Sequence, residues 1–209
     1  MMKLIIQSVR QTIVWGIILG VAYPVIMTIF AQTCFHNQAN GSLVERNGKI
    51  IGSALMAQQF QGTNYFWPRP SACTYGCSAS GFVSSSGSNL GPTSGTLKTN
   101  VENNIASFIS GNNLPTNTVV PPDMVFASAS GLDPHISPEA ARLQIARVAA
   151  SRGVGEEKIK TLVDRFTEPP QWGFLGQARV NVLLLNVALD EETAGKKPGQ
   201  VALNIGRPL

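Results

Sequence analysis

The sequence predicts a mixed α/β fold: one N-terminal transmembrane helix followed by a single compact domain. Thirty-four consecutive residues, 11–44, carry no Asp, Glu, Lys or Arg and begin with an apolar run. The roughly 175 residues beyond that run suit one domain with its own core, whereas two domains would each be thin. Within them, helix-forming and strand-forming patterns both occur, without an internal repeat.

The first predicted element is a membrane-spanning helix over residues 11–33. At about 1.5 Å per residue it is roughly 34 Å long, enough to cross a hydrocarbon core of about 30 Å. The stub 1–10 holds Lys3 and Arg10 and no acid. The positive-inside rule therefore places this stub in the cytoplasm and residues 34–192, an extracytoplasmic domain, on the outer side. A signal peptide or lipidation at Cys34 is the alternative, but the run exceeds the about 7 to 15 apolar residues of a signal peptide.

The domain begins with a predicted β-hairpin over residues 42–51. Asn47-Gly48 supplies the positive φ angles of a tight turn between two short strands. Residues 54–60 contain good helix formers and predict a short helix. A long irregular region rich in Gly and Ser follows, over residues 62–95.

Further elements follow from apolar spacing and capping residues. Apolar side chains three or four apart predict a helix over 96–109, closed by Gly111. Ser137-Pro138-Glu139 begins a helix, because Ser caps free amides and Pro has its φ preset. The remaining predictions are a strand 124–129, the end of the Ser137 helix at Gly153, a helix 156–166, a central strand 179–189 buried on both faces and a polar tail 193–209.

Charge and cysteine content exclude several classes of function. The net charge is +4, and without the stub's Lys3 and Arg10 the chain has 14 bases against 12 acids, with no basic run. A nucleic-acid-binding protein is therefore not expected. Cys34, Cys73 and Cys77 leave open a Cys73–Cys77 disulfide, a pairing with Cys34, or free thiols. A zinc site is not expected, because the two histidines lack ligand spacing with the cysteines.

No catalytic signature is present, so no catalytic or metal-ligating residue is predicted. The chain lacks G-x-S-x-G, S-x-x-K, H-E-x-x-H and the phosphate-binding G-x-x-x-x-G-K-[ST] loop. The Gly/Ser stretch 80–95 has no lysine, so we expect an ordered loop or contact surface there.

Two local blocks are more specific. In 65–72, an aromatic cluster precedes Arg69, which is held between prolines. This is typical of a partner contact, and the alternative is an aromatic plug that seals the core. In 128–138, Asp133 and His135 suggest an acid/base pair, and the alternative is that both order the loop through backbone hydrogen bonds.

Five blocks in order carry a family resemblance: YFWPRPSA, SGSNLGPTS, ASASGLDPHISPEAA, QIARVAASRG and LGQARVNVLLLNVALD. Together with the single N-terminal span, they resemble the C subunit of the Kdp potassium-transporting P-type ATPase. The resemblance extends from the span to about Asp190. The segment SACTYGCSASGFVSSSG departs from the family pattern.

The resemblance implies an accessory, non-catalytic, single-pass subunit of a high-affinity potassium pump in a bacterial cytoplasmic (inner) membrane. The implied partners are a channel-like potassium-translocating subunit, a P-type ATPase subunit and a small single-span subunit. It also implies a catalytic chaperone that raises the affinity of the ATPase subunit for ATP. A domain on the outer side cannot contact cytoplasmic ATP. Its effect on ATP affinity would therefore be allosteric, through a coupling free energy between the outer domain and the nucleotide site across the membrane. ATP is a possible ligand of this chain by the resemblance only, no other cofactor is predicted, and potassium is the transported ion of the complex.

The predicted contact residues fall into two groups. Gly16 and Gly20 form G-x-x-x-G and Pro24 continues the spacing, which favours close packing of a neighbouring transmembrane helix. The candidate partner or cation-contact loops contain Arg69, Ser71, Ser88, Asn89, Gly91, Pro92, Asp133 and His135. In these loops, oxygen atoms at an outer potassium path would modulate potassium uptake. The alternative functions are a membrane-anchored enzyme or a ligand-binding module that uses the Asp133/His135 region.

Overall fold

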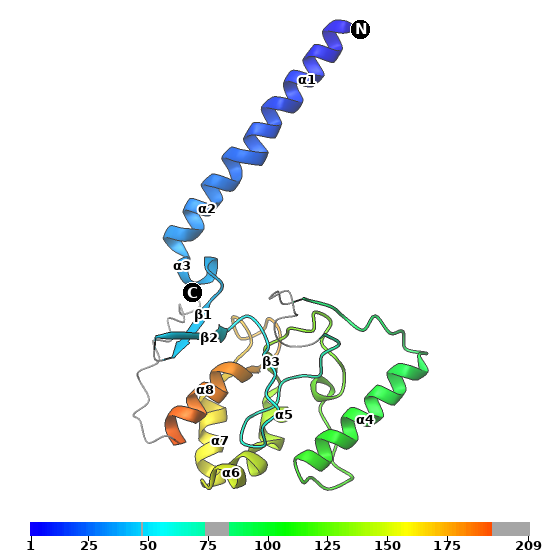
Figure 1. Ribbon diagram of the computed structural model, residues 1–209, viewed down its shortest axis with the longest axis vertical. Helices are drawn as coiled ribbons and strands as arrows, with labels where there is room; N and C mark the ends of the chain where they lie inside the picture. The colour runs from blue at the N-terminus through cyan, green and yellow to red at the C-terminus, as the bar shows by residue number, and fades with distance from the viewer. Residues whose placement is uncertain (47, 74–83, 194–209) are drawn as a thin grey trace. The chain divides into compact units, whose positions relative to one another are not determined.

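The computed structural model describes residues 1–46, 48–73 and 84–193, shown as ribbon in Figure 1. The described chain divides into two units, one formed by residues 1–43 and one that begins at Val44. The predicted tail 193–209 lies outside the described residues from position 194, as do Asn47 and Cys77.

The first unit is helical. Its elements are α1 (Met2–Ile17), the π-helical turn η1 (Ile18–Ala22), α2 (Tyr23–Cys34) and α3 (His36–Ala39). Residues Met2–Cys34 form the one helix in the described chain whose length and apolar composition suffice to cross a membrane. It contains the predicted span 11–33. The π-turn precedes Pro24: Tyr23 N–H donates to the Ile18 carbonyl, five residues back, and Pro24 has no N–H to donate.

The second unit opens with the predicted hairpin. Strands β1 (Leu43–Arg46) and β2 (Lys49–Ser53) pair in a two-stranded sheet, and Gly48 has the positive φ of +74° that the turn requires. The predicted helix 54–60 is wrong. Ala57 N–H donates to the remote Leu132 carbonyl over 2.9 Å, so this backbone is bound by another loop instead of its own turn.

Helix α4 (Gly95–Gly111) confirms the helix predicted over 96–109, and the Ser94 side chain caps it by accepting from Leu97 N–H. The predicted strand 124–129 is wrong. Pro122–Met124 forms a 3-10 turn, η2, in which Val125 and Phe126 N–H both donate to the Pro122 carbonyl. Consecutive prolines at 121 and 122 favour this local bonding over a strand.

The helix predicted from Ser137 to Gly153 is present but divided. Its parts are α5 (Pro138–Leu143) and α6 (Ile145–Arg152), and the next helix is α7 (Glu156–Arg165). Ser137 Oγ accepts from Ala140 N–H over 3.1 Å, which confirms the predicted cap. Gly153 ends α6 with a left-handed φ of +65°, also as predicted. The division falls at Gln144.

A three-stranded antiparallel sheet has the order β3 (His135–Ile136), β5 (Arg179–Asn181), β4 (Thr167–Glu168). The central position of β5 confirms the start of the predicted strand 179–189, but from Val182 the chain is helix α8 (Val182–Thr193). Asn181 Oδ1 accepts from Leu184 N–H over 3.1 Å and caps this helix. Because residues 182–189 are all buried, no polar face reveals a helical period in the sequence.

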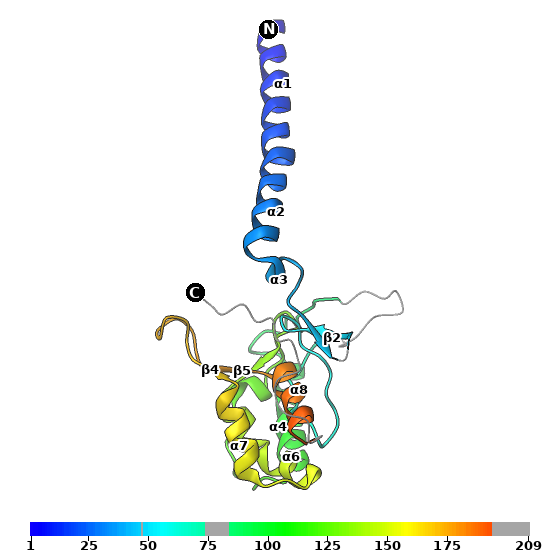
Figure 2. The same cartoon turned by 90° about the vertical axis from the view of Figure 1, so that its left-hand side faces the viewer.

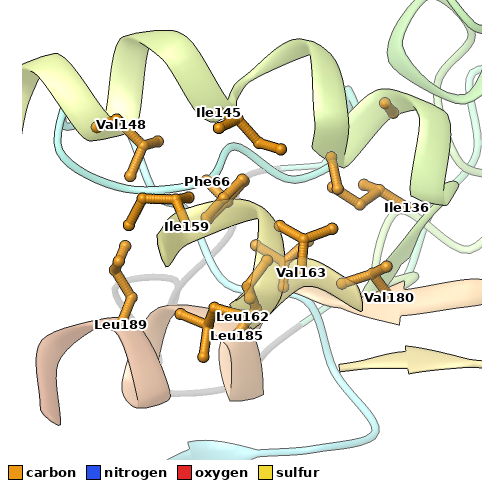
Figure 3. Close-up of a cluster of buried hydrophobic side chains, with 14 of the residues drawn as sticks. Phe66, Ile136, Ile145, Val148, Ile159, Leu162, Val163, Val180, Leu185 and Leu189 are labelled. Atoms are coloured by element: carbon orange, nitrogen blue, oxygen red, sulfur yellow. The ribbon is translucent and has the colours of Figure 1, made fainter. Parts of the chain in front are cut away.

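Helices α6, α7 and α8 enclose the main core together with the sheet and an irregular segment (Figure 3). Among its fully enclosed side chains are Phe66, Ile136, Val148, Leu162, Val163, Val180, Leu185 and Leu189. A smaller cluster joins β1 to α8 through Val44, Leu183, Leu184 and Val187. The mixed helix-and-sheet class predicted for the domain is therefore confirmed.

Candidate functional site

The structure brings four of the predicted contact residues together at the meeting of two loops. Arg69 Nη1 lies 2.6 Å from Asp133 Oδ2. Ser71 Oγ donates to the Gly131 carbonyl over 2.8 Å, so the first loop is tied to the second at two points. Gly131 has a φ of +71° and is packed against this contact, which leaves no room for a side chain.

Asp133 is the electrostatic centre of this site. Its Oδ1 accepts from the backbone N–H of His135 over 3.0 Å and lies 3.5 Å from His135 Nδ1. Partial burial by itself raises the pKa of Asp133, but the hydrogen bonds from His135 and Arg69 outweigh burial and hold the pKa well below its usual range. The carboxylate is therefore ionised and already engaged at neutral pH.

An open cleft of about 830 Å³ lies beside this cluster. Charged residues of both signs line it, namely Arg69, Asp123, Asp133, Glu139 and Arg179, together with the imidazole of His135. Besides the paired Arg69 and Asp133, Asp123 and Arg179 are also bound within the protein. Asp123 accepts from both the backbone N–H and the hydroxyl of Ser137, at 2.7 and 3.1 Å. Arg179 lies 3.0 Å from Glu168.

Asp133 and Ser137 are both engaged in structural contacts at this site. A general base works best with a pKa near neutrality, and that of Asp133 is lowered instead. The hydroxyl of Ser137, which also lines the cleft, donates to Asp123 and caps α5. Within the part of the chain that the structure describes, no group of three or more His, Cys, Asp or Glu side chains is placed to hold a metal ion.

The other predicted contact residues lie on an exposed stretch that precedes α4. They are Ser88, Asn89, Gly91 and Pro92. The base of this stretch is bound to the same turn as Ser71, because Ser86 N–H and Ser85 Oγ both donate to the Ser130 carbonyl, at 3.1 and 2.8 Å. Both predicted loops thus converge on residues 128–131.

The aromatic block beside Arg69 is a core plug, the alternative that the sequence left open. Phe66 is completely buried, and Asn186 holds its backbone: Phe66 N–H donates to Asn186 Oδ1 over 2.8 Å, and Asn186 Nδ2 donates back over 2.9 Å. Trp67 N–H donates in the same way to Gln144 Oε1 over 2.8 Å. This segment belongs to no strand, and the two amide side chains take the place of a strand partner.

Arg147 is a third side chain that holds this backbone. Residues 65–67 are here called the clamped segment, and Gln144, Arg147 and Asn186 the polar clamp. The Arg147 guanidinium lies 4.1 Å from the Trp67 ring and donates to the Tyr65 carbonyl over 2.9 Å and to Asn112 Oδ1 over 2.8 Å. Burial lowers the pKa of Arg147 to about 10. Gln144, Arg147 and Asn186 were not predicted as contact residues from the sequence. The available signal was a polar residue inside an otherwise apolar run, as at Asn186 within residues 182–189.

The predicted transmembrane packing residues lie on the long helix of the first unit. An added Cβ at Gly16 or Gly20 meets no atom within 4 Å, so both positions are open to a neighbour. Pro24 follows the π-turn. Cys34 and Cys73 are free thiols, and Cys73 Sγ lies 3.2 Å from Ser71 Oγ.

Comparisons with known proteins agree on one family. The model of the family KdpC, described as "K+-transporting ATPase, c chain", matches residues 5–191. A protein of Paraburkholderia phymatum named "Potassium-transporting ATPase KdpC subunit" is 49% identical over 177 residues, which cover 84% of this chain and 90% of the relative. Proteins of the same name from Methylococcus capsulatus and Mycobacterium tuberculosis are 49% and 43% identical, over 88% and 91% of this chain and 95% and 99% of the relatives.

Proposed function

The chain belongs to the KdpC family of subunits of the K+-transporting ATPase, and we propose that it serves this pump as an accessory, non-catalytic subunit. The observation that carries this proposal is the state of Asp133. Its carboxylate joins two loops through Arg69 and accepts from the backbone N–H of His135 in its own loop, and the hydrogen bonds from these two residues lower its pKa. The best candidate for a reactive group is thus used to order a surface.

We further propose that the domain lies on the outer side of the cytoplasmic membrane. The basic stub before the span supports this orientation by the positive-inside rule. In this arrangement the converging loops, with Ser88, Asn89 and Asp133, form the surface that meets the pump near the outer end of its potassium path. The partners would be a channel-like subunit, a P-type ATPase subunit and a small single-span subunit.

The membrane helix would contribute to assembly as well as anchoring. Gly16 and Gly20 leave open backbone on one face, where a helix of a partner can approach closely. Any influence on the affinity of the pump for ATP would be exerted at a distance, as a coupling free energy between the two sides of the membrane. ATP is not expected to touch the domain.

The test compares the pump assembled with and without this chain. We expect the purified full chain to show no ATP hydrolysis, and the larger subunits to lose potassium-stimulated ATPase activity, or to dissociate, without it. Gly16→Leu combined with Gly20→Leu should reduce co-purification, whereas Ala22→Leu, which at about 100° per residue lies on the opposite side of the same helix, serves as the control. Turnover by the chain alone, or a fully active pump without it, contradicts the proposal.

The outer surface is tested separately. A pump that carries Asn89→Ala should show a changed potassium concentration for half-maximal ATPase activity while assembly is retained. Asp133→Ala removes the ion pair with Arg69 that joins the two loops. It should change the potassium concentration for half-maximal activity in the same direction as Asn89→Ala. Unchanged potassium dependence in both variants would remove these loops from the potassium path. A reporter fused to the C-terminus decides the orientation independently, and a cytoplasmic result would refute the outer placement.

A further inference from the structure

The connection between β4 and β5 ends in an exposed apolar tip. Trp172, Phe174 and Leu175, here called the apolar tip, expose 77%, 74% and 45% of their surfaces. The whole connection, residues 169–178, contains no charged residue. Large apolar side chains that are exposed together are typical of a surface that contacts a membrane or another protein.

The tip is an ordered hairpin end. Gln171 N–H donates to the Leu175 carbonyl and Leu175 N–H donates back to the Gln171 carbonyl, both over 2.9 Å. Phe174 N–H also donates to the Gln171 carbonyl, over 3.2 Å. At the base, β4 pairs with β5, and Arg179 Nε lies 3.0 Å from Glu168. The backbone is therefore satisfied within the hairpin, and the apolar side chains project from it.

Trp172 occupies a position that its own conformational preference does not explain. Its φ is +53° and that of Gly173 is +82°. Two consecutive positive φ angles are typical of the tight hairpin turn that Asn-Gly forms most readily. A bulky aromatic residue in the left-handed region is disfavoured relative to Asn. The turn itself would be better formed by Asn, so the geometry of the turn does not account for a Trp side chain at this position.

The tip is carried at the tethered end of the domain. Val44, the first residue of the second unit, packs against Leu183 and Leu184, directly after β5. Figure 2 shows the β4–β5 connection and β2 at the same end of this unit, with α6 at the other end. Between the membrane helix and Val44 lie only residues 35–43, which span at most about 30 Å when fully extended.

We propose that the apolar tip inserts into the interfacial layer of the membrane that anchors the chain. Trp favours this layer, where its ring is buried and its N–H reaches polar groups. Because the tip is uncharged, its insertion should not depend on anionic lipid. Three projecting side chains are few for a stable protein interface, which buries about 800 Å² on each partner, whereas a bilayer requires no complementary surface. This inference goes beyond the pump function and holds on either side of the membrane.

The test uses the full chain reconstituted into phosphatidylcholine vesicles. Trp15→Phe removes the fluorophore of the membrane helix, and adding Trp172→Asn isolates the signal of Trp172 by difference. We expect this signal to be quenched by spin-labelled lipid, most strongly when the label is near the headgroup, and to be protected from aqueous acrylamide. Quenching by acrylamide with no effect of the labelled lipid overturns the proposal.

The assembled pump distinguishes lipid from protein as the occupant. A photoreactive amino acid in place of Phe174 should form adducts with lipid, whereas adducts with another subunit would overturn the proposal. Trp172→Asn separates contact from folding, since its unfolding midpoint should be equal to or above that of the parent while the lipid contact is lost. Val119→Asn is the matched control, because Val119 is 83% exposed and lies outside this hairpin; it should leave lipid contact unchanged.

Discussion

Two aromatic segments of the domain have similar composition and opposite environments. Phe66 is completely buried, whereas Phe174 exposes 74% of its surface. The two segments differ in the hydrogen-bond partners of their backbones. The backbone of Phe66 is hydrogen-bonded by the side chain of Asn186, which lies far along the chain, whereas the backbone of the hairpin 171–175 is hydrogen-bonded within the hairpin. A local run of aromatic residues therefore does not determine its burial. Polar partners elsewhere in the sequence do.

The largest loss of stability is expected from removal of the buried ring. Phe66→Ala should lower the free energy of unfolding of the full chain in detergent by about 4 kcal/mol, through lost burial and the cavity that remains. Denaturant unfolding followed by near-ultraviolet circular dichroism measures the change. A loss below about 1 kcal/mol would mean that the core closes without this ring.

The polar clamp should matter almost as much as the ring. Asn186→Ala removes the partners of both Phe66 backbone groups, and each buried group left unpaired costs about 1–3 kcal/mol. We expect a loss of about 3 kcal/mol in the same unfolding measurement. Asn103→Ala, at an exposed position of α4, is the matched control and should change stability by less than about 0.5 kcal/mol. Equal effects of the two substitutions would contradict the clamp.

Two glycines of α4 test how tightly the clamped segment is packed. A Cβ added at Gly111 collides with the Trp67 ring, whose Cζ3 it meets at 2.7 Å, whereas one added at Gly95 meets no atom within 4 Å. Gly111→Ala should therefore destabilise by about 1–2 kcal/mol through overpacking, although Ala is the better helix former. Gly95→Ala should be neutral or slightly stabilising. The same sign at both positions would show that Trp67 is free to move.

Much of the fold was predictable where an element carries its own signals, whereas the failures at 54–60, 124–129 and 182–189 have different physical causes. The helices at 95–111 and 156–165 and the cap at Ser137 follow from signals within one element. The strand predicted over 179–189 became a helix because complete burial erases periodicity.

The contact residues show the same limit. Arg69 and Asp133 were identified from their blocks, and the structure joins them. Gln144 and Asn186 were missed, because their partners lie 77 and 120 residues away and no local pattern encodes such pairing.

Acid should weaken the ion pair between Arg69 and Asp133, and so lower the free energy of unfolding. Because the pKa of Asp133 is lowered on folding from its ordinary 3.8, its stabilisation is present above that pH and is lost as the pH falls toward the folded value. Asp133→Asn should cost about 1 kcal/mol at pH 7, since the pair is partly solvent-screened. Urea unfolding should show a smaller difference between variant and parent at pH 3. A pH-independent difference would assign the effect to packing.

The smallest effect on folding is expected at the exposed ring. Phe174→Ser leaves the hydrogen bonds of the hairpin in place and removes little buried surface, so the free energy of unfolding in detergent should change by less than about 0.5 kcal/mol. The same change from aromatic to polar at Phe66 should cost at least as much as the loss of about 4 kcal/mol expected for Phe66→Ala. A loss above about 1.5 kcal/mol for Phe174→Ser would place this ring against the domain and remove the contrast. With stability unchanged, any defect of this variant in lipid contact belongs to the apolar tip itself.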